Sequence, residues 1–145
     1  WERHCGRSAG VPDDDVRAAA LDDAGRLCIV GQNRTLHRQG PDSAAVEVGN
    51  LREVIPEDAH WPNPLTVDLA VVGSDWFIVD YFGHRLLRWR ECLGAEVVEV
   101  AGATWGYVPD LLRGQLAWPK GIAASAAGDL FITQDLAYKG GQLVQ

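Results

Sequence analysis

Three short apolar runs recur at a nearly constant distance along the chain. Each follows a small or polar turn pair and contains four mostly apolar residues, at 25–30, 74–79 and 128–133. Their central residues, Ile29, Ile78 and Ile132, are 49 and 54 positions apart, a period longer than that of leucine-rich or ankyrin repeats and close to that of propeller blades. Because the runs are apolar at consecutive positions and rich in branched or aromatic residues, they predict strands buried on both faces.

Two further elements repeat in the same order. Val-Glu-Val at 46–48 returns at 98–100, 52 positions later, and Trp-Pro at 61–62 returns at 118–119, 57 positions later. Several elements repeating in one order indicate a duplicated structural unit. A tryptophan that recurs at one repeat position favours packing between blades over the alternative, a ligand-binding aromatic cluster.

The remaining segments of each unit also predict strands. Residues 84–89 mix basic and apolar positions, and Tyr-Phe-Gly at 81–83 separates them from the preceding strand by a tight turn that glycine tolerates. Residues 97–100 predict an outer strand, and the small residues at 121–125 predict an inner strand near a propeller axis. Residues 13–21 begin with aspartates able to cap a helix, but their place before the first recurring run favours an inner strand.

These segments together predict an all-β fold, a fragment of a β-propeller with about three four-stranded antiparallel blades. The repeat units are expected at about residues 12–50, 51–102 and 103–145, and the last unit is truncated in its third strand. Since a blade without a neighbour exposes an apolar face, we expect the remaining blades to come from the same chain or from another chain.

The second and third units resemble NHL repeats. The general form of that family is Pro-x-Gly-hydrophobic-Ala, a turn with Gly, a strand ending in Asp, and then Asn-His-Arg before another strand. Residues 118–123 match the opening, and residues 80–86 match the hairpin, with Gly83 where the family usually has Asn. The first unit has neither Asp nor His at 31–34, and the third has a longer connection after Asp135. The resemblance implies a closed ring, commonly of six blades, each a four-stranded antiparallel sheet.

The composition fits a folded domain and disfavours nucleic acid as a partner. The 145 residues are 47% hydrophobic and 23% charged, enough for one sizeable core. Thirteen Lys plus Arg against twenty Asp plus Glu give a net charge of −7, which repels polyphosphates at long range. No stretch approaches the roughly 20 apolar residues of a membrane-spanning helix, and the sequence indicates no compartment.

The three cysteines, Cys5, Cys28 and Cys92, lie far apart and contain no Cys-x-x-Cys pair. Their spacing therefore predicts neither a zinc site nor a complete set of disulfides. Cys28 lies inside an apolar run, which predicts an inert buried thiol. Asn33 begins a glycosylation sequon, but it falls where a hairpin turn is expected, and its use depends on a secretory route that the sequence does not show.

One cluster of polar residues, at the hairpin of the second unit, has chemical potential. Asp80 beside His84 is the kind of pair that orients a general base, and Arg85 is able to hold an anion. The alternative, which we favour, is structural: Asp80 accepts backbone amide hydrogen bonds, and His84 and Arg85 pack between blades. A binding role for this region would involve Asp80, His84, Arg85, Arg88 and Trp89. The basic and aromatic stripe that continues to Arg90 would also suit RNA, which the acidic net charge disfavours.

No catalytic, metal or cofactor site is readable from the sequence. The aspartates at 13–15 and 22–23 lack the spacing of a calcium loop, which favours a solvated, turn-forming acidic run. Nucleophile, P-loop and dinucleotide motifs are missing. Related six-bladed lactonases and lyases hold a metal at the axis with ligands from several blades. The residues able to play that part do not recur at one equivalent strand end; they are His60, Asp68, Asp80 and Asp135.

Two functions follow as hypotheses. The first is a non-enzymatic scaffold whose propeller face or loops bind a protein or peptide, with no cofactor. The regular repeats motivate it, and connections of different length, such as 81–83 against 136–141, would set its specificity. The second is a metal-dependent six-bladed hydrolase or lyase, similar to lactonases or amidating lyases and using a divalent ion such as calcium, which rests on kinship of fold alone.

Overall fold

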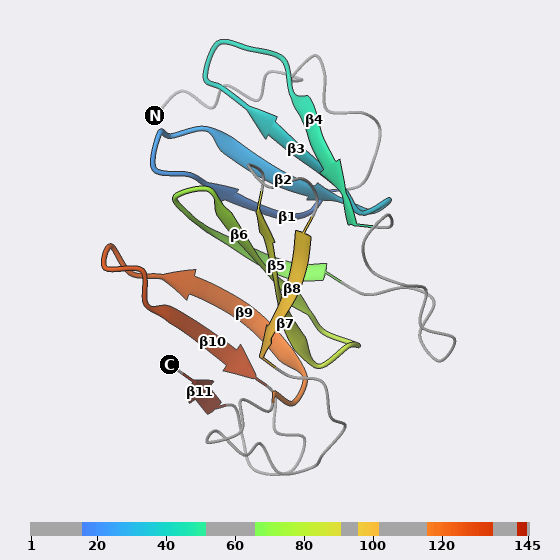
Figure 1. Cartoon of the computed structure of the whole chain (residues 1–145), viewed down its shortest axis with the longest axis vertical. Coiled ribbons are helices and arrows are strands. Elements are labelled where there is room, and N and C mark those ends of the chain that lie inside the picture. The colour runs from blue at the N-terminus through green and yellow to red at the C-terminus, as the bar shows by residue number, and fades with distance from the viewer. Residues whose placement is uncertain (1–15, 52–65, 91–95, 102–115, 135–141, 145) are drawn as a thin grey trace, which may run out of the picture.

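The computed structural model describes residues 16–51, 66–90, 96–101, 116–134 and 142–144. These residues form three antiparallel sheets that follow one another along the long axis of the molecule (Figure 1). No helix long and apolar enough to span a bilayer occurs among the described residues. The prediction of an all-β fold is confirmed.

Each sheet is a meander, in which strands that are consecutive in the chain pair as neighbours. Blade 1 contains β1 (Val16–Leu21), β2 (Leu27–Gly31), β3 (Thr35–Gln39) and β4 (Val46–Asn50). Blade 2 contains β5 (Thr66–Val72), β6 (Asp75–Asp80), β7 (Arg85–Arg90) and β8 (Glu96–Ala101). Blade 3 contains β9 (Pro119–Ala124), β10 (Leu130–Gln134) and β11 (Gln142–Val144), three strands within the described part of the chain.

The recurring sequence elements occupy equivalent places in the blades. The three apolar runs form β2, β6 and β10, the second strand of each blade, and the two Val-Glu-Val segments lie in β4 and β8, the fourth strands. The alanine-rich segment forms β1 and not a helix. The first strands approach one another, β1 beside β5 and β5 beside β9, as expected where blades converge on an axis.

The second strand of blade 2 is buried on both faces because it has a blade on each side. Side chains of a strand alternate between its faces, so Trp76 and Ile78 enter the apolar cluster shared with blade 1, whereas Phe77 and Val79 enter the cluster shared with blade 3. Consecutive apolar positions are therefore required here, which explains the pattern in the sequence.

The interface between blades 1 and 2 is built around two tryptophans. The rings of Trp76 and Trp89 meet edge to face, with centroids 5.4 Å apart, and both side chains are almost fully buried. Gly49 on β4 lies directly under Trp89: a Cβ atom at position 49 would come within 2.8 Å of Cζ2 of the indole. A glycine in this strand is needed because the backbone and the aromatic ring approach so closely.

The turns between first and second strands are alike in blades 1 and 3. Gly25 and Gly128 adopt positive φ angles of 72° and 89°, which glycine reaches without steric cost. Three residues before each glycine, Asp22 and Ser125 accept backbone N–H groups of the turn through their side-chain oxygens. In Figure 1 these turns lie on the left, and the turns between second and third strands of blades 1 and 2 lie on the right.

Candidate functional site

The hairpin between β6 and β7 is held by the carboxylate of Asp80. Its side chain is 1% exposed. Oδ1 accepts the backbone N–H of Gly83 at 3.1 Å, and Oδ2 accepts Nε–H of Arg85 at 2.9 Å. Both oxygens are thus engaged within the turn, so Asp80 fixes the position of Arg85 and closes the hairpin.

Gly83 lies close to the ion pair inside the hairpin. A Cβ atom at position 83 would collide with Oδ2 of Asp80 and with Nε of Arg85. Any larger residue would therefore displace the ion pair. The glycine at this position is thus coupled to the way in which this hairpin packs.

His84 connects the hairpin to blade 3. It has a positive φ of 52°, and its side chain is buried. Nδ1 accepts the backbone N–H of Trp118 at 3.1 Å, directly before β9, and the two rings contact with centroids 4.3 Å apart. Burial lowers the pKa of His84 below its usual range against the opposing charge of Asp80. The neutral ring is consistent with Nδ1 acting as an acceptor.

Aromatic side chains surround this junction of blades 2 and 3. Tyr81 contacts Phe82 with ring centroids 5.4 Å apart and Trp118 with centroids 5.0 Å apart. All three rings are partly exposed. Together with Arg85, whose side chain is 22% exposed, they form what we call the hairpin surface: Tyr81, Phe82, Arg85 and Trp118. The sequence analysis identified Arg85 but missed the role of Tyr81 and Phe82, which there marked only a turn.

Arg88 and Trp89 lie apart from the hairpin surface. Trp89 is 2% exposed and points toward blade 1. Arg88 belongs to the opposite face of β7, where its Nε lies 4.0 Å from Oδ2 of Asp75. Arg90 contacts the same carboxylate through Nε and Nη2 at 2.7 and 3.0 Å, and these hydrogen bonds hold the pKa of Asp75 below its usual value. Of the five residues proposed for binding, three therefore meet at the hairpin.

The residues considered as axial metal ligands are engaged elsewhere or lie outside the described part of the chain. Asp68 accepts the N–H of Leu69 through Oδ1 at 2.9 Å and the N–H of Ile122 through Oδ2 at 2.8 Å, which links β5 to β9. His60 and Asp135 fall outside the described residues. Within those residues no three His, Cys, Asp or Glu side chains gather to hold a metal ion. The described groups therefore do not fit an axial metal, and no reaction step is derived through one.

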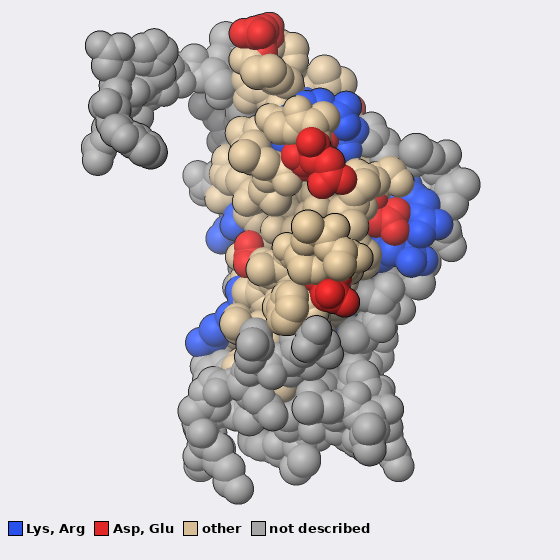
Figure 2. All heavy atoms as spheres, turned by 90° about the vertical axis from the view of Figure 1, so that its left-hand side faces the viewer, with Lys and Arg blue, Asp and Glu red and all other residues tan. Residues whose placement is uncertain are grey.

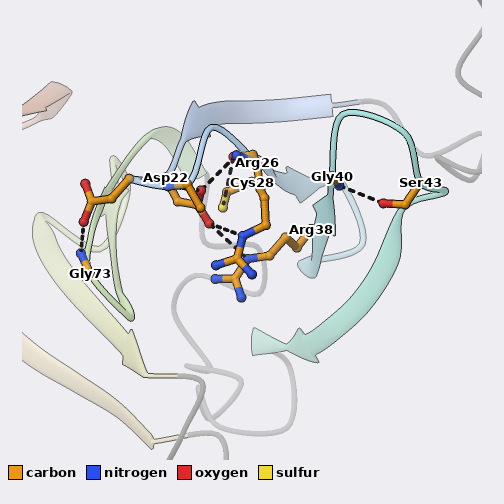
Figure 3. A network of polar contacts seen from close by, with 9 residues as sticks. Asp22, Arg26, Cys28, Arg38, Gly40, Ser43 and Gly73 are labelled. Carbon is orange, nitrogen blue, oxygen red and sulfur yellow. Dashed lines mark hydrogen bonds and ion pairs between the residues drawn. The ribbon is translucent and has the colours of Figure 1, made fainter.

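A second polar network lies at the turn between β1 and β2. Figure 3 shows Asp22 between two arginines: Oδ2 contacts Nε of Arg26 at 2.7 Å and Nε of Arg38 at 3.5 Å. Burial alone would raise the pKa of Asp22, but hydrogen bonds from Arg26 and Ala24 outweigh it and hold the pKa below its usual value. The sequence analysis took this aspartate for part of a solvated acidic run. Its side chain is instead 1% exposed.

Cys28 and Asn33 were singled out for their chemistry. Cys28 is fully buried in blade 1, and burial raises the pKa of its thiol, in agreement with an inert thiol. Asn33 is exposed in the turn between β2 and β3, as the sequence predicted. Cys5 and Cys92 lie outside the described residues.

Charged side chains of both signs are mixed on the face that carries the turns between first and second strands. Figure 2 looks onto this side of the molecule, where red and blue groups lie interspersed, some of them side by side, in a largely uncharged surface. Such mixed charge does not create the basic stripe that tracks a phosphate backbone.

Comparison with known proteins identifies the fold. No protein-family model matches the chain, and no curated protein is similar to it. Solved structures do match: a selenomethionine form of virginiamycin B lyase from Staphylococcus aureus, with a TM-score of 0.53 and 13% identity, covers 90% of this chain. A catalytically inactive histidine-to-alanine variant of that lyase with quinupristin has a TM-score of 0.55, 15% identity and the same 90% coverage. A streptogramin B lyase has a TM-score of 0.53, 12% identity and 92% coverage.

The chain spans 41% of the length of each of these structures. At this level of identity the likeness concerns the fold alone. Together with the three radially related sheets, it shows that the chain is a fragment of a β-propeller.

Proposed function

We propose that this chain is a non-enzymatic binding scaffold that engages a protein or peptide through the hairpin surface. The observation that carries the proposal is the construction of the β6–β7 hairpin. Its ionisable groups hold it in place, Asp80 within the turn and His84 against blade 3, whereas aromatic rings and a guanidinium remain partly exposed. Aromatic and arginine side chains on a rigid support are the residues that dominate protein interfaces.

The loops on this side also suit recognition. The connections between second and third strands contain residues 32–34, 81–84 and 135–141 in the three blades. Loops that differ while the scaffold repeats are the usual source of specificity in repeat proteins. Membership of the NHL family is part of the same proposal, supported by the Pro-x-Gly opening at 119–121 and the Asp80 hairpin.

A selection from a random peptide library displayed on phage, against the immobilised chain, tests the proposal. We expect selected peptides to bind in solution and to lose about fivefold or more in affinity with Phe82→Ala or Arg85→Ala, because interface hot spots of this kind contribute more than about 1 kcal/mol each. Calorimetry measures the affinity, and circular dichroism verifies that the variants remain folded.

Arg17→Ala is the matched control, since Arg17 is an exposed arginine on β1 of blade 1 and does not belong to the hairpin surface. Its binding should equal that of the parent chain. Arg88→Ala shows whether the opposite face of β7 takes part. Recovery of no peptide, or peptides that ignore the hairpin variants, would contradict the scaffold proposal.

A second candidate function is that of a propeller lyase or hydrolase, here with a divalent metal, and the solved structures that share the fold favour it because they are lyases. It requires ligands from elsewhere, because the described residues offer no suitable set. Turnover of quinupristin or virginiamycin B by the chain, together with a thermal shift on addition of calcium or zinc, would support it and count against the scaffold.

A further inference from the structure

The contact of His84 with blade 3 differs from the other links between blades. Asp68 and Asp23 also accept a backbone N–H from the next blade, at Ile122 and Gly73. Those acceptors are carboxylates. His84 is an imidazole, the side-chain type whose ordinary pKa lies within the physiological range. Proton uptake near neutral pH therefore acts on the His84 link.

The geometry requires His84 to be neutral. Nδ1 accepts the N–H of Trp118 at 3.1 Å, and an imidazolium has no lone pair left for this role. Protonation would place two donors face to face and leave the Trp118 amide without its acceptor. Such an unpaired buried donor is costly.

The surrounding groups compensate only in part for a charge on His84. The carboxylate of Asp80 on β6 favours the charged ring, but its oxygens already accept hydrogen bonds from Gly83 and Arg85. Arg85 on β7 is itself a cation. From blade 3 the ring is faced by Trp118, which does not titrate. Burial disfavours the charged ring further, in agreement with the lowered pKa of His84.

We propose that His84 is a proton-sensitive latch between blades 2 and 3, which holds the entrance of β9 when neutral and releases it when protonated. Release would separate Trp118 from the other three residues of the hairpin surface, Tyr81, Phe82 and Arg85. Mild acidification would then change the surface and the blade interface together. The latch is independent of what the surface binds, so its test does not depend on the proposed function.

The sign of the pH dependence follows from linkage. A histidine with a lowered pKa in the folded state contributes stability that is complete above its unfolded value of 6.5 and is lost as the pH falls below that value. Because one proton is involved, the folded-to-unfolded ratio should fall by at most about tenfold per pH unit, and the fall should stop below the folded-state pKa. Asp22 and Asp75 have lowered pKa values and act in a more acidic range.

The experiment is a pH series from about 8 to about 5 on the whole chain and two variants, with urea unfolding and the NMR signals of the Trp118 amide and the His84 ring. In the parent chain the amide and the ring should titrate together, and stability should fall between pH 6.5 and the pH at which these two signals titrate. In His84→Asn the amide Oδ1 takes the place of Nδ1. Asparagine does not titrate and tolerates the left-handed backbone, so the stability of this variant should not change across the pH series. His84→Ala should be less stable than His84→Asn at both ends of the pH range, and its stability should also not change with pH.

Either of two results would overturn the proposal. One is a fall of stability with pH that persists in His84→Asn but disappears in His37→Asn. That result would assign the pH dependence to His37, which is also buried. The other is a Trp118 amide signal that does not follow the His84 ring in the parent chain, a measurement that needs no variant to fold.

Discussion

Replacing Trp89 by alanine should cost about 3–5 kcal/mol of folding free energy, the range for truncating a large aromatic side chain in a core. Trp89 is 2% exposed and contacts Trp76 edge to face across the interface of blades 1 and 2. Removing the indole leaves a cavity between two sheets that cannot easily collapse. Since domains are stable by only about 5–15 kcal/mol, the loss is a large share of the total. Urea unfolding followed by circular dichroism measures it.

A double-mutant cycle with Gly49 tests the contact itself. In the parent chain Gly49→Ala should cost about 1–3 kcal/mol, because the new methyl group meets the indole at close to 2.8 Å. In the Trp89→Ala background the same change should cost less than about 0.5 kcal/mol, since the space is then open. Equal costs in both backgrounds would mean that Trp89 does not lie over Gly49.

Removing the carboxylate of Asp22 should cost about 3 kcal/mol, because Asp22→Ala takes this buried acceptor away from two backbone amides of the turn and from two arginine side chains. Asp22 accepts the N–H groups of Ala24 and Arg26 through Oδ1 and faces both Arg26 and Arg38 through Oδ2. The Arg38 side chain is 11% exposed, so its charge would have little access to water. The contribution of Asp22 should also decline as the pH falls below 3.8, its ordinary value, because its pKa is lowered in the folded state.

Ser125 provides the matched control for Asp22. It occupies the same place in the turn of blade 3, but its hydrogen bonds are exposed to solvent and no arginine faces it. Ser125→Ala should therefore cost only about 0.5–1 kcal/mol. Asp22→Ser keeps the turn acceptor and removes the charge, so its cost should fall between the two. Urea midpoints compare the three variants, and equal costs for Asp22→Ala and Ser125→Ala would show that the arginines contribute nothing.

The repeat architecture was predictable from the sequence because burial on both faces leaves a continuous apolar run. The segments around Ile29, Ile78 and Ile132 each form a strand as predicted, the second of its blade. The expected burial on both faces is found in β2 and in most of β6, but in β10 Phe131 is only half-buried and Thr133 is exposed. The hairpin at Asp80 was predictable for a related reason: the turn is local, and its hydrogen bonds join residues at most five positions apart.

Contacts between blades were not predictable in the same way. Gly49 and Trp89 meet across an interface that the sequence does not specify residue by residue, and so do His84 and Trp118. Arg88 and Trp89 were expected to act with the hairpin because they are close to it in the chain. Consecutive side chains of a strand, however, point to opposite faces of the sheet. Asp22 was taken for a solvated residue because its partner Arg38 belongs to a strand not adjacent to it in sequence.

Three side chains each accept a hydrogen bond from a backbone N–H of the next blade: Asp23, Asp68 and His84. Each joins only consecutive blades, so the cooperative unit is the nearest-neighbour pair and not the whole array. Blade 2 has a described partner on both sides and should open last in native-state hydrogen exchange. In such a linear array the loss of one interface divides the protein into shorter cooperative segments, so that a single unfolding midpoint no longer describes it.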